Sequence, residues 1–175
     1  MKKIYSIFTL LIMTAIILTS CQQSKKLASS DEIGTYAFNV LTNLESLSEN
    51  EYINRFYTFE ELKSYVLAHP DEFGKEFLEN YKVITKKDFN SRLIADYNKL
   101  QQEGTTFQID WSEIEPVNYQ YWPRATNGVQ SMKGDLFFTH NKKAYKVTVT
   151  AFKAGTDFYV TKINDFSAVK EQAKK

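Results

Sequence analysis

The sequence predicts an α+β fold in which N-terminal helices pack on a curved antiparallel sheet of about four strands. Apolar residues recur every three or four positions up to Gly104 and every second position after it, which marks a change from helix to strand. The strand-like segments of the C-terminal part are joined by connections short enough only for hairpins. With 175 residues, 43% hydrophobic and 25% charged, the chain is expected to form a single α+β domain over residues 31–175.

Helix starts are indicated by a Ser or Thr placed three residues before an acid, the pattern of a capping box. Each start is followed by apolar residues at helical spacing, and Pro70 ends one of these helices. Another helix is expected from Asp71 to Val83, and Gly104 is expected to close the last one. The four capping patterns are Ser29–Glu32, Ser48–Glu51, Thr58–Glu61 and Thr85–Asp88.

The sheet is expected to begin at Phe107, where Phe107, Ile109 and Trp111 alternate with polar residues. Pro116 suits an edge strand or a bulge. In the last strand the apolar spacing changes from two to three after Val160, which calls for a bulge. The residues expected to face the helices are Leu136, Phe138, Tyr145, Val147, Val149, Ala151, Phe158 and Val160.

The first twenty residues have the pattern of an export signal. Lys2 and Lys3 precede an apolar run, Ile7–Leu18, that is too short to cross a bilayer comfortably and is followed by a small polar pair. Leu18-Thr19-Ser20-Cys21 resembles the lipobox of bacterial lipoproteins. The resemblance implies cleavage before Cys21, acylation of that residue, and attachment to the cell envelope.

On this interpretation residues 1–20 are a lipoprotein signal peptide and residues 21–30 a lipidated tether that lifts the domain off the bilayer. Gln22 after the cysteine favours the outer membrane. Whether the protein faces the periplasm or the cell surface is left open. The alternative is an uncleaved N-terminal anchor helix.

Three segments of the predicted sheet, Gly134–Phe138, Tyr145–Val149 and Asp157–Ile163, resemble the NTF2-like superfamily, specifically small lipoproteins of that cone shape. The resemblance implies helices covering one face of a curved sheet. That superfamily includes isomerases, dehydratases, ligand carriers and assembly modules, so the fold leaves the activity open.

Several function classes lose support from composition. A formal net charge of +1 argues against a general nucleic-acid binder. One cysteine and two histidines are too few for a disulfide framework or a Cys/His zinc site, so no metal and no cofactor are expected. For an enzyme, the candidates are the two histidines and three acids around Trp111, with solvated surface positions as the alternative. These residues are His69, His140, Asp110, Glu113 and Glu115.

Aromatic residues gather at the start of the predicted sheet, where rings can stack on a sugar or an apolar ligand. The alternative is ordinary core packing. The candidate ligand-binding residues are Trp111, Tyr119, Tyr121, Trp122 and Arg124.

A second apolar group, Phe137, Phe152 and Tyr159, has the parity opposite to the helix-facing residues. An outer sheet face this apolar is expected to meet a second copy, giving a homodimer, or a partner protein. The function predicted first is therefore a membrane-anchored binding module for a small apolar or glycan ligand or an envelope protein. An enzyme in the same cone and an immunity or assembly factor are the alternatives.

Overall fold

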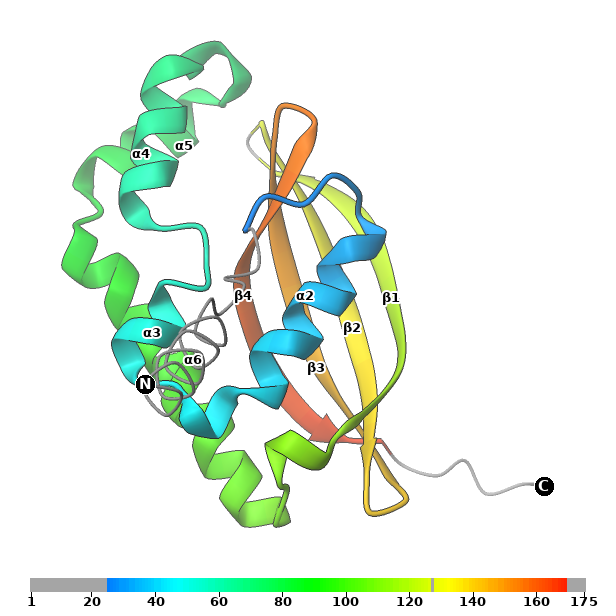
Figure 1. Ribbon diagram of the computed structural model, residues 1–175. Helices are drawn as coiled ribbons and strands as arrows, with labels where there is room; N and C mark the ends of the chain where they lie inside the picture. Colours follow the sequence, from blue (N-terminus) through cyan, green and yellow to red (C-terminus); the bar gives the residue numbers. More distant parts are fainter. Residues whose placement is uncertain (1–24, 127, 170–175) are drawn as a thin grey trace, which may run out of the picture.

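A computed structural model describes residues 25–126 and 128–169 and shows five α-helices packed with one open, curved sheet of four antiparallel strands (Figure 1). This confirms the predicted α+β fold. Cys21 and the predicted signal peptide lie outside the described residues. The helices are α2 (Asp31–Thr42), α3 (Glu49–Ile53), α4 (Phe59–Ala68), α5 (Lys75–Val83) and α6 (Lys86–Phe107), and the strands are β1 (Glu115–Thr126), β2 (Val129–His140), β3 (Lys143–Ala154) and β4 (Asp157–Ala168).

The strands follow one another in the order β1-β2-β3-β4, so the sheet is a meander of hairpins, as predicted. Asn141 and Lys142 both have positive φ, 50° and 65°, which is the geometry of a two-residue turn that matches strand twist. The register between β3 and β4 shifts at two places, one of them between Thr150 and Ala151. These shifts confirm the predicted bulge and keep Val160 and Ile163 on the same buried face.

The main core lies between α2 and the inner face of the sheet (Figure 1). All the residues predicted to face the helices are buried, with Phe138, Val147 and Val149 fully enclosed. Burying an aliphatic or aromatic side chain of this size stabilises the fold by about 1.5–3 kcal/mol. The alternation of apolar and polar residues therefore identified the buried face of the sheet.

Three of the four predicted capping boxes form, at Ser48, Thr58 and Thr85, each with both reciprocal hydrogen bonds. The prediction for the first helix is wrong. Ser30 is the N-cap of α2 but makes no capping hydrogen bond: its backbone is helical, with φ of −64° and ψ of −26°, rather than extended as at the three caps that form. Its hydroxyl donates to the Tyr121 hydroxyl.

The predicted strand at Phe107–Trp111 is also wrong. Helix α6 runs through Gly104 to Phe107, and Gln108, with φ of 54°, closes it. Trp111 then begins a short 3-10 helix. The glycine serves close packing rather than termination, because a Cβ at Gly104 would collide with the indole nitrogen of Trp111.

A second apolar cluster covers the outer face of the sheet near the turns that end β1 and β3. It is formed mainly by α4, α5 and the segment before α4. Tyr57 stacks on Phe152 and on Tyr159, at ring-centroid distances of 5.7 Å and 4.4 Å. Tyr65 accepts a hydrogen bond from the Gly155 amide at 2.7 Å, which ties α4 to the β3–β4 turn.

The two edge strands of the sheet, β4 and β1, differ in how far other segments of the described chain cover them. Along β4, Leu27 exchanges two backbone hydrogen bonds with Phe158, and the Tyr57 amide donates to the Val160 carbonyl, so the edge is partly covered. Leu27, within the predicted tether, is thereby part of the core. Along β1, no described strand pairs with the outer edge. This edge contains Pro123 and, beside a register shift, Pro116, which confirms the edge or bulge position predicted for Pro116.

Candidate functional site

An open cleft of about 320 Å³ lies between α2 and the free edge strand β1. It contains two of the predicted ligand-binding residues, Tyr119 and Tyr121, whose rings stack at 5.2 Å. Ligand sites in proteins usually have volumes of about 300–1,000 Å³, so the cleft is at the small end of that range. Its lining is completed by Asp31, Gly34, Thr35, Phe38, Pro116, Val117, Asn118 and Leu136.

Two glycines from distant parts of the chain shape the cleft around the Tyr119 ring. A Cβ at Gly34 would lie 2.5 Å from the Tyr119 Cβ, and a Cβ at Gly134 would lie 2.6 Å from the Cε2 atom of the same ring. Only glycine lets α2 and β2 approach Tyr119 this closely. Neither glycine was predicted to have a role, although a lone glycine inside a helical pattern and another inside a strand pattern indicate a close approach of this kind.

A hydrogen-bonded group of polar side chains lies at the N-terminal end of α2. The Tyr121 hydroxyl donates to Asp31 Oδ1 at 2.7 Å and accepts from Ser30 Oγ at 3.0 Å. The Tyr119 hydroxyl has no hydrogen-bond partner among the described residues, and burial raises the pKa of Tyr119 above its ordinary value. The cleft therefore offers apolar ring surface along its length and an acceptor carboxylate, whereas the enclosed Tyr119 hydroxyl is not presented to a ligand.

The other three predicted ligand-binding residues lie elsewhere. Trp111 is 1% exposed and packs between Phe138 and Phe166 in the core. Trp122 and Arg124 alternate with the cleft residues along β1 and are exposed. Because successive side chains of a strand point to opposite faces, these two lie on the outer face of the sheet. The five residues do not form one cluster.

The candidate acid–base residues do not converge either. His69 ends α4 on the surface, with Nδ1 3.6 Å from Glu72. His140 is buried, and its Nε2 accepts a hydrogen bond from the Asp110 amide at 3.3 Å. The Asp110 carboxylate accepts hydrogen bonds from Ser112, which are the main cause that lowers its pKa.

Glu113 and Glu115 are exposed beside His140 and line an open hollow with it. Among the described residues, no group of three His, Cys, Asp or Glu side chains is placed to hold a metal ion.

The predicted interface residues have the outer parity expected for them. Phe152 is buried under Tyr57, Tyr65 and Phe73 of the same chain, and the Tyr159 ring stacks on Tyr57. Phe137 is half-buried, with the Lys146 ammonium 6.0 Å from its ring centre. Contact with a second copy or a partner protein stays a prediction, for which Phe137 is the residue not covered by the second cluster.

Comparison of the chain with protein-family models, with curated proteins and with solved structures gave no match. No helix within the described part of the chain is long and apolar enough to cross a membrane.

Proposed function

We propose that this protein is a lipoprotein of the bacterial cell envelope, anchored through Cys21, in which the α2–β1 cleft binds a ligand without catalysis. The anchor is supported by Leu18-Thr19-Ser20-Cys21 after a charged and then apolar N-terminus. The outer membrane as its location, and membership of the NTF2-like family, are parts of the same proposal and rest on the sequence pattern.

The binding role rests on one observation, the apolar cleft between α2 and β1. Phe38, Val117 and Tyr119 supply apolar surface, and Asp31 lies where a hydroxyl or an amine of the ligand is recognised. The ligand class proposed is therefore a small apolar molecule or a glycan, whose ring faces stack on tyrosine. A side chain of an envelope protein would use the same surface.

The binding role is tested at two exposed valines, one inside the cleft and one outside it. Val117 lines the cleft and is 58% exposed, whereas Val83 ends α5 and is 76% exposed. In the mature chain, Val117→Asp should weaken binding of the uncharged dye N-phenyl-1-naphthylamine by about tenfold, since an apolar ring bound in the cleft would strip water from the new carboxylate. Val83→Asp should leave dye binding unchanged. Equal dye affinities in the two variants would contradict an apolar site in the cleft.

The anchor is tested separately by replacing Cys21. Cys21→Ser should abolish metabolic labelling with palmitate and release the protein from membranes into the soluble fraction. Retained labelling would contradict acylation at this residue.

A further inference from the structure

The N-terminal end of the described chain is attached to the domain by contacts at three consecutive residues. Leu27 is 4% exposed, donates to the Phe158 carbonyl at 3.0 Å and accepts from the Phe158 amide at 2.9 Å. Lys25 Nζ lies 2.8 Å from Glu61, and Lys26 Nζ lies 2.9 Å from Asp157. We call these contacts of Lys25, Lys26 and Leu27 the clamp. From Lys25 onward the chain is therefore held against the folded domain.

The clamp leaves a short distance between the proposed acylation site and the domain. Lys25 follows Cys21 by four residues, which span at most about 14 Å when fully extended. A folded domain of about 145 residues has a radius of gyration of about 15 Å. Even fully extended, the stretch from Cys21 to Lys25 is therefore shorter than the radius of gyration of the domain.

We propose that the acylated protein lies directly against the bilayer, with the surface around Lys25, at the beginnings of α4 and β4, turned toward the lipid headgroups. This proposal rests on the proposed function in one respect, the acyl chains on Cys21. Because four residues cannot lift the domain away, the headgroup layer that holds the anchor is the partner of this surface.

Three lysines at this surface lie in ion pairs with acidic residues. Besides the two ion pairs of the clamp, Lys86 at the start of α6 lies 3.4 Å from Glu60. A polybasic patch is what draws a protein to anionic lipids, and these paired groups do not make one. The acyl chains therefore supply the attachment, and the orientation should be the same on neutral and on anionic membranes.

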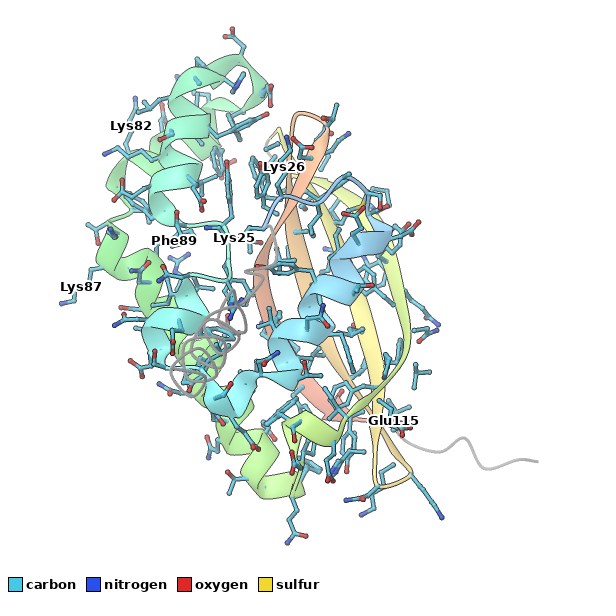
Figure 2. All side chains as sticks on the ribbon, in the orientation of Figure 1. Lys25, Lys26, Lys82, Lys87, Phe89 and Glu115 are labelled. Carbon is cyan, nitrogen blue, oxygen red and sulfur yellow. The ribbon has the colours of Figure 1, made fainter. Side chains whose placement is uncertain are left out.

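The sheet provides two reference points at different distances from the clamp. Figure 2 shows Lys26 beside the β3–β4 turn and Glu115 at the opposite end of the sheet. Through the register of the sheet, the first point lies level with Ala154 on β3 and the second with Ala144. The ten residue steps from Ala144 to Ala154 span about 33 Å at the rise of a strand.

A cysteine label at each point measures the orientation. The chain has a single cysteine, which the acyl group occupies, so an introduced cysteine is the one free thiol. Thr156→Cys, beside the clamp, and Glu115→Cys are each labelled with bimane after the mass of the purified protein has shown its acyl chains. The proteins are then placed in phosphatidylcholine vesicles that carry a nitroxide on the lipid headgroup.

The expected result is quenching about threefold stronger at position 156 than at position 115, since the nitroxide acts at short range and β3 separates the two levels by about 33 Å. The ratio should persist when a third of the lipid is phosphatidylglycerol. A Gly/Ser insert of twenty residues between Ser24 and Lys25 spans about 25 Å on average and should remove the difference.

Equal quenching at the two positions in acylated protein, or an insert without effect, would overturn the membrane orientation and leave the lipid anchor standing. A purified protein whose mass lacks acyl chains would overturn the proposed anchor itself, and the orientation with it.

Discussion

The two tryptophans of the chain allow the assignment of core and surface to be tested directly. Trp111 is 1% exposed, with its ring 5.9 Å from Phe138 and 6.2 Å from Phe166, whereas Trp122 is 39% exposed on β1. A buried tryptophan removes about 150–250 Å² from water. At about 25 cal/mol per Å², this burial is worth about 4–6 kcal/mol, close to the 3–5 kcal/mol measured for Trp→Ala in protein cores.

We therefore expect Trp111→Ala to lower the free energy of unfolding by about 3–5 kcal/mol, and Trp122→Ala to lower it by less than about 1 kcal/mol. Urea denaturation of the mature chain carrying Cys21→Ser, followed by far-UV circular dichroism, measures both. Fluorescence provides a control: the protein that keeps only Trp111 should emit at shorter wavelength than the one that keeps only Trp122. Similar losses in the two variants would refute the assignment of Trp111 to the core.

Three further predictions use variants on other elements. Leu27→Ala should cost about 2–4 kcal/mol of stability because Leu27 is in the core, whereas Leu67→Ala, at a residue 71% exposed, should cost under about 0.5 kcal/mol; equal losses would contradict the clamp. Gly34→Ala, which by helix propensity alone would stabilise, should destabilise by about 1–3 kcal/mol because its Cβ meets Tyr119, while Thr35→Ala on the exposed side of α2 should be near neutral in the same titration. Burial raises the pKa of Glu61, but hydrogen bonds from Lys25 and Thr58 outweigh burial and hold the pKa below its ordinary value. Its contribution to stability is thus present above about pH 4.3, the unfolded value, and is lost as the pH falls through the lower folded value. Glu61→Gln should therefore flatten the dependence of the free energy of unfolding on pH in this range.

Local signals were sufficient for much of the fold. Ser48, Thr58 and Thr85 were recognised as N-caps because a capping box is complete within four residues of sequence. The end of α6 was misplaced because a glycine that closes a helix and a glycine that admits a neighbouring ring look alike in sequence. What distinguishes them at Gly104 is the contact with Trp111, which only the tertiary structure reveals.

The candidate site was half predictable. Tyr119 and Tyr121 were identified as ring-bearing residues, and the alternation along β1 already separates them from Trp122 and Arg124, although all four were grouped together. The α2 side of the cleft was missed, because the approach of Gly34 to Tyr119 joins residues 85 positions apart. Contacts of this kind depend on tertiary packing, and no periodic pattern in the sequence indicates them.

If the proposed anchor at Cys21 confines the protein to a membrane, the open edge of β1 matters more than it would for a protein dissolved in bulk. Copies attached to one leaflet diffuse in two dimensions at similar height above the bilayer. Their unpaired strand edges therefore meet far more often than those of freely rotating molecules in solution. Pro123 has no backbone N–H to donate to an incoming strand. Pro116, near the other end of β1 and beside the register shift, has none either. The two prolines therefore disfavour edge-to-edge pairing of β1 strands between neighbouring copies.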